Sequence, residues 1–115
     1  MTEKEQIEQQ IEISIDQAKQ IIERKEQMER LLQNPDFKAV FSEGYFRDEA
    51  ARLVSLLADQ EMSAPEKQTE LIKDMQGISA MQLYILNVRR LGAQMEQALR
   101  AHEEALEEIR AEEEE

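Results

Sequence analysis

The sequence contains no cysteine, no tryptophan, one histidine, three glycines and two prolines among its 115 residues. Without cysteine there is no disulfide framework and no thiolate metal site. One histidine cannot build a multi-histidine metal centre, and so few glycines leave no phosphate-binding loop. We therefore expect no cofactor, no metal and no enzymatic activity, and we expect His102 to lie on a solvated face.

Long apolar segments are also missing. No apolar run approaches the roughly 20 residues that are needed to cross a bilayer. The first six residues, MTEKEQ, lack the basic start and apolar core of a signal peptide. We expect a soluble protein that acts in the cytoplasm and makes no contact with a membrane.

The residues that are abundant favour helices. Glu, Gln, Ala, Leu, Lys, Arg and Met dominate the chain, and these residues lose least when they enter a helix. Isoleucine recurs at positions 7, 11, 15 and 22 with Ala18 on the same face, which is a helical spacing and not an alternating one. The predicted fold class is all-α.

The first helix is predicted over residues 3–33. Thr2 and Glu5 have the spacing of a capping box at its start. Its apolar stripe is imperfect, because Lys25 interrupts it. Asn34-Pro35 ends this helix, since a residue before proline disfavours helical geometry, and Asn34 is then the N-cap of a new helix.

Two short helices are predicted next, over residues 35–43 and 45–58. Gly44 separates them in a C-terminal capping role.

A long helix is predicted over residues 64–110. Ser63, Pro65 and Glu66 mark its start as a cap, a first-turn proline and the closing residue of a capping box. Gly77 and Gly92 mark either a kink or a close contact between helices, and we favour the contact. Residues 78–91 are apolar on nearly every face, so we expect them to form the buried centre.

The long helices, roughly 45 Å and 70 Å at 1.5 Å per residue, are too long for a compact monomer of this size. We predict a single domain over residues 1–110, in which they form an antiparallel hairpin of the coiled-coil type and associate with other subunits. The alternative is a monomeric three- or four-helix bundle in which the last helix is broken at Gly77 or Gly92.

Four of the five aromatic residues fall within ten positions, at Phe37, Phe41, Tyr45 and Phe46. They form either a local core or a knob that anchors a partner. We expect Phe41 and Phe46 in the core and Tyr45 exposed. The methionines at 75, 81 and 95 follow the apolar stripe, and adaptable core is favoured over a binding groove for them.

The charge of −12 is concentrated at the C-terminal end, where residues 103–115 hold eight glutamates and one arginine. Residues 111–115 are predicted to be a disordered acidic tail, because like charges repel and nothing apolar remains to be buried. The tail either keeps the protein soluble or occupies a basic groove of a partner. The candidate protein-interaction residues are Phe37, Tyr45, Met75, Met81, Glu103, Glu104, Glu107 and Glu108.

A resemblance adds to these expectations. The segment of residues 34–59, NPDFKAVFSEGYFRDEAARLVSLLAD, followed by an acidic helical end, resembles small acidic helical proteins of tailed bacteriophages. That group is often encoded among virion-structure genes. The resemblance covers roughly residues 29–112 and implies a role in virion assembly, in the cytoplasm of a bacterial host or in the virion. It implies no cofactor and no catalytic residue.

Two function classes remain. The first is an oligomeric structural or assembly protein, such as a scaffold, a chaperone or a minor virion component, which binds itself and another phage or host protein. The second is an acidic mimic of nucleic acid that inhibits a host nuclease or defence protein. Direct nucleic-acid binding is disfavoured, because a chain at −12 repels phosphate.

Overall fold

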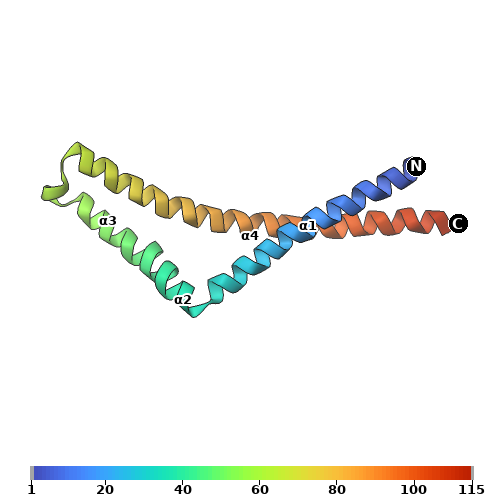
Figure 1. The fold of residues 1–115 in the computed structure, drawn as a ribbon, viewed down its shortest axis with the longest axis horizontal. Coiled ribbons are helices and arrows are strands. Elements are labelled where there is room, and N and C mark those ends of the chain that lie inside the picture. The colour runs from blue at the N-terminus through green and yellow to red at the C-terminus, as the bar shows by residue number, and fades with distance from the viewer. Residues whose placement is uncertain (1, 115) are drawn as a thin grey trace. The chain divides into compact units, whose positions relative to one another are not determined.

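The structure, a computed structural model, describes residues 2–114, and the backbone of that part is helical with no strand (Figure 1). The all-α prediction is confirmed. The elements in chain order are α1 (Glu3–Gln33), α2 (Pro35–Phe37), η1 (Lys38–Glu49), α3 (Ala50–Leu57), η2 (Gln60–Met62) and α4 (Pro65–Glu114). None of the described helices is long and apolar enough to cross a membrane.

The chain forms two compact units. The first unit combines Met1–Met28 with Val88–Glu115, and the second is the continuous segment Glu29–Asn87. The N-terminal part of α4 therefore belongs to the second unit and its C-terminal part to the first. The prediction from the sequence was one domain over residues 1–110, without this division.

The bounds of α1 agree with the prediction because its capping signals operate as expected. The Glu5 amide donates to Thr2 Oγ1 at 3.1 Å, and the Thr2 amide donates to Glu5 Oε2 at 3.4 Å. At the other end, Asn34 Oδ1 accepts from the amides of Asp36 and Phe37 at 2.9 and 3.1 Å. Asn34 thus caps the helix that begins at Pro35.

The predicted break at Gly44 is wrong. Residues 35–57 form one uninterrupted helical segment, and Gly44 lies inside η1, which has the wide turns of a π-helix with i→i+5 hydrogen bonding. Gly44 does not have the positive φ of a capping glycine. A Cβ added here would lie 3.0 Å from the carbonyl oxygen of Ala39, five residues earlier, so glycine allows the backbone to pass close to that carbonyl.

The last helix, α4, begins at Pro65 and continues for 50 residues to Glu114. Neither Gly77 nor Gly92 interrupts it, so the predicted alternative of a broken helix is wrong. Its predicted end at residue 110 is four residues too early, and the backbone of residues 111–114, assigned to a disordered tail, is helical. The end of that tail, Glu115, lies outside the described residues.

In the first unit α1 packs antiparallel against α4 (Figure 1). Glu12 of α1 pairs with Arg110 of α4 at 3.1 Å, and Lys25 of α1 pairs with Glu96 of α4 at 2.7 Å. The residue number of the partner on α4 therefore falls as the residue number on α1 rises, which defines an antiparallel pair. Ile15, Ala18 and Leu106 are buried. One series of protected positions in α1 recurs in alternating steps of four and three, which is the spacing of a helix face. Its members are Lys4, Glu8, Ile11, Ile15, Ala18, Ile22 and Lys25, and Ser14, Ile21 and Met28 beside it are half-buried as well.

Gly92 lies where the side chain of Lys25 on α1 packs against α4. A Cβ at this position would overlap the side-chain carbons of Lys25, and Gly92 is buried. The preference for a helix contact over a kink is confirmed at Gly92. The same contact explains the lysine that interrupts the apolar stripe, because its stem covers Gly92 while its ammonium group reaches Glu96.

In the second unit η1 and α3 pack against the N-terminal half of α4. The core consists of Leu53, Leu71 and Ile78, and Leu53 is only 1% exposed. The turn before α4 is held by Gln68, whose amide nitrogen donates to the carbonyls of Leu57 at 3.2 Å and Met62 at 2.8 Å. These two bonds satisfy carbonyls at the end of α3 and in η2 that the helices leave without a partner.

Alanine substitutions at the two glycines of α4 should change the stability of the protein in opposite directions. Gly92→Ala should destabilise the protein, because overpacking against Lys25 costs about 1–3 kcal/mol and exceeds the helix-propensity gain of about 1 kcal/mol. Gly77→Ala should stabilise it by about 1 kcal/mol, since the only atom near the new Cβ is Tyr45 Oη at 3.7 Å, an ordinary contact. Urea denaturation followed by circular dichroism measures both. Equal shifts in the same direction would contradict the contact at Gly92.

Candidate protein-interaction surfaces

The predicted interaction residues fall into two groups. Phe37, Tyr45, Met75 and Met81 are half-buried in the second unit, where Tyr45 and Met75 pack against the same core. The acidic candidates lie on α4 in the first unit and are exposed; they are Glu103, Glu104, Glu107 and Glu108. His102, expected on a solvated face, is half-buried.

The four clustered aromatic residues form a continuous series of ring contacts. Phe37 and Phe41 stack with centroids 5.1 Å apart, Phe41 meets Tyr45 edge-on at 6.2 Å, and Tyr45 lies 5.8 Å from Phe46. The expectation for Phe46 is confirmed, because it packs on the core. The expectation for Tyr45 is wrong, because it is half-buried against that core. The wider turn of η1 reduces the angle between adjacent residues, which lets both Tyr45 and Phe46 face inward.

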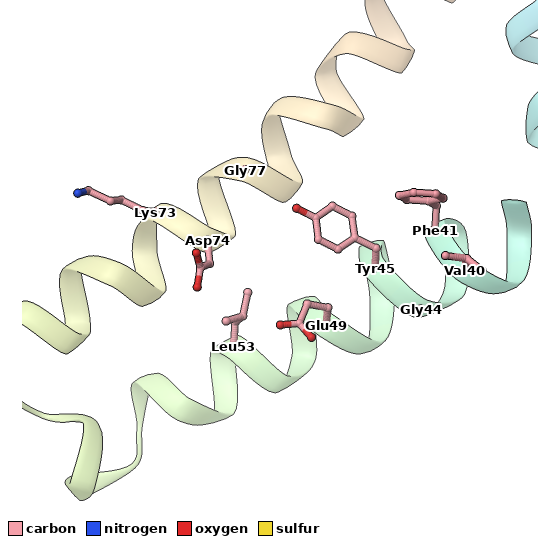
Figure 2. A pocket seen from close by; sticks show the side chains of 9 residues that line it. All are labelled: Val40, Phe41, Gly44, Tyr45, Glu49, Leu53, Lys73, Asp74 and Gly77. Atoms are coloured by element: carbon pink, nitrogen blue, oxygen red, sulfur yellow. The ribbon is translucent and has the colours of Figure 1, made fainter.

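A groove of about 560 Å³, which we call the aromatic groove, lies beside this series (Figure 2). Val40 and Phe41 provide apolar surface, Tyr45 provides a ring with a hydroxyl, and Gly44 and Gly77 leave room for an occupant. Leu53 also borders the groove but is buried in the core. Glu49, Asp74 and Lys73 supply the charges. Phe41, expected in the core, is half-buried and lines this groove.

The charged groups that face the aromatic groove are predominantly carboxylates. Asp74 points from α4 toward the facing helix, whereas the side chain of Lys73 points away (Figure 2). Lys73 Nζ lies 3.9 Å from Glu70. Glu49 accepts from Arg52 through both carboxylate oxygens, and the Nε bond is 3.0 Å long. These hydrogen bonds lower the pKa of Glu49, with a smaller contribution from the charge of Arg52.

A second surface lies on α4 in the same unit. Leu83, Tyr84 and Leu86 are 54%, 60% and 38% exposed, and we call these three residues the apolar patch. From the sequence we expected residues 78–91 to form the buried centre. Ile78 and Ile85 are buried as expected, but one chain covers only one face of the helix and leaves the patch in contact with solvent.

The two surfaces differ in how visible they are in the sequence. The apolar patch could be found there, because the apolar residues of this stretch exceed what one helix face accommodates. The aromatic groove could not, because it depends on the π-helical turns of η1 and on the register between η1 and α4.

No metal centre emerges from the described residues, among which no group of three or more histidine, cysteine or carboxylate side chains could hold an ion. Comparison of the chain with protein-family models, curated proteins and solved structures yields no match. The resemblance to proteins of tailed bacteriophages therefore stays a prediction from the sequence.

The ion pair at the groove predicts a pH response. Arg52→Gln should raise the pKa of Glu49 toward its usual value, because it removes the guanidinium donor. Because the pKa of Glu49 is lowered on folding, the pair stabilises the protein above the unfolded-state pKa, and this contribution disappears as pH falls through the folded-state pKa. Titration of the carboxyl ¹³C resonances measures the shift. Arg47→Gln is the control, since Arg47 pairs with Asp48, and an equal effect on Glu49 would contradict the assignment.

Proposed function

We propose that this protein is a non-enzymatic assembly protein of the phage type, which self-associates and acts through protein–protein contacts. The observation that carries the proposal is the apolar patch. Three large apolar side chains within one turn of α4 are exposed in a chain of net charge −12. Their burial in a second copy would contribute roughly 25 cal/mol for each Å² removed from water.

Within one chain the buried face of α4 already has the spacing of side-by-side helix packing. The buried positions of α4 in the second unit, Leu71, Ile78 and Ile85, are spaced seven residues apart, which is the repeat of helices that pack side by side. Leu83 and Leu86 lie on a different face of the same helix. A second helix packed on that face would convert the pair into a bundle and would remove the apolar patch from water.

The proposed role is that of an oligomeric scaffold, chaperone or minor virion component. Its partners are other copies of the chain and a further phage or host protein, in the cytoplasm of a bacterial host or in the virion. The phage assignment is supported by the sequence resemblance given above. The long helices suit a structural role, and no family model matches the chain.

A second candidate is an acidic inhibitor that mimics nucleic acid and binds a host nuclease or defence protein. Exposure of four glutamates on α4, in a segment where residues 103–115 carry −7, favours it. The two candidates differ in salt dependence. A mimic should lose its partner steeply as salt rises, because exposed charge provides its affinity. A complex held by the apolar patch should tolerate the same salt.

Self-association predicts a mass well above 13.4 kDa by light scattering at micromolar concentration. Leu83→Glu should shift the mass toward that of the monomer, because a carboxylate would be buried without a partner. Circular dichroism should show unchanged helicity, since Leu83 is exposed within one chain.

Gln76→Glu is the matched control for this variant. Gln76 is exposed and lies seven residues before Leu83 on the same side of α4, so that the variant adds the same charge without removing an apolar side chain. It should keep the mass of the unmodified protein. A monomer for the unmodified protein at micromolar concentration would overturn the proposal.

Truncation tests the acidic end separately. Deletion of residues 111–115 should leave helicity and melting temperature nearly unchanged, because alanine is the only apolar residue in their sequence, AEEEE. The deletion should leave the oligomer mass unchanged if the apolar patch holds the assembly. A fall in melting temperature of more than a few degrees would show that the end of α4 stabilises the fold.

A further inference from the structure

We propose that the aromatic groove binds a lysine or arginine side chain of a partner protein. The inference deepens the proposed function, on which it rests, because it names the chemistry by which a second protein docks. It concerns a different surface from the apolar patch, so an experiment can refute the groove proposal without refuting self-association, and the reverse.

The apolar half of the groove suits the stem of a long cationic side chain. Val40 and Phe41 line it, and Val40 is 61% exposed, which leaves apolar surface available to an occupant (Figure 2). Lysine and arginine bury their methylene stems along such surfaces and keep the charged group at a polar end.

Two carboxylates from opposite sides provide the polar end. Glu49 belongs to η1 and Asp74 to α4, and both line the groove. The one cation of the lining, Lys73, points away from it (Figure 2). A guanidinium or ammonium group between the two carboxylates would be attracted by both, and the guanidinium group of Arg52, which bonds to Glu49 from outside the lining, would oppose it.

Tyr45 adds a third interaction. Its ring lies between Phe41 and the acidic end of the groove, and its hydroxyl points toward α4 near Gly77 (Figure 2). A cation near the face of a tyrosine ring is attracted by the ring quadrupole. Apolar stem, aromatic ring and carboxylates therefore follow one another in the order in which a lysine or arginine side chain presents its parts.

An apolar occupant fits this groove less well. An apolar side chain from a second copy would cover Glu49 and Asp74 without supplying a donor or a positive charge, and the burial of an unpaired carboxylate is costly. Glu49 already accepts hydrogen bonds from one guanidinium group, that of Arg52, which lies outside the lining of the groove. The partner cation would compete with Arg52 for that carboxylate.

The experiment is an NMR titration of the ¹⁵N-labelled full chain with Nα-acetyl-arginine amide. The matched neutral probe is Nα-acetyl-citrulline amide, which has the same shape and no charge. We expect saturable shifts at Tyr45, Glu49 and Asp74, and affinity for the neutral probe lower by about threefold, the effect of one exposed ion pair.

Three variants locate the binding within the groove. Asp74→Asn should weaken binding of the arginine probe by about threefold, whereas Glu70→Gln, one turn earlier on α4, should not. Gly77→Ala should weaken binding because its methyl group occupies the groove, although it stabilises the helix. Arg52→Gln should strengthen binding, because it removes the guanidinium group that competes for Glu49.

Equal affinity for the two probes, shifts centred on residues 103–112, or equal effects of Asp74→Asn and Glu70→Gln would overturn the proposal. Leu83→Glu separates it from the proposed function. That variant should lose self-association and keep its affinity for the arginine probe. Loss of the probe with an intact oligomer would refute the groove alone, and a monomeric unmodified protein that binds the probe would refute only the assembly role.

Discussion

Burial of the apolar stripe of α4 is the interaction on which both units depend. A helix of 50 residues without an interior proline must cover that stripe along its length, and the chain supplies α1 in one unit and η1 with α3 in the other. The core is correspondingly thin, with Leu53, Leu71 and Ile78 at its centre in the second unit. Because each unit covers only one face of α4, apolar side chains on its other faces stay exposed.

Polar groups at the interface of the first unit set the register of its helices. Lys25 would be unfavourable in an apolar seam, but Gly92 gives its stem room and Glu96 receives its charge at 2.7 Å. A shift of one helix by a turn would place Lys25 against a larger side chain and separate it from Glu96. Such polar contacts contribute little to stability and much to the choice of one alignment.

Binding surfaces arise where this packing leaves groups uncovered. The π-helical turns of η1 turn Tyr45 inward beside Phe46 and open a groove between Glu49 and Asp74. The apolar patch arises from the excess of apolar residues in the middle of α4. In our proposals the groove takes a cationic side chain and the patch takes another helix, so self-association and the capture of a second protein would use separate surfaces.

The sequence by itself determined the helical fold class, the bounds of α1 and the start of α4, because capping residues and proline act within a few residues of each other. It also indicated that Gly92 marks a helix contact. Only the tertiary structure decided that Gly44 lies within a continuous helix, because packing of the aromatic residues against α4 overrides a local ending signal. The aromatic groove depends on the alignment of residues far apart in the sequence, such as Glu49 and Asp74, and no local pattern encodes that alignment.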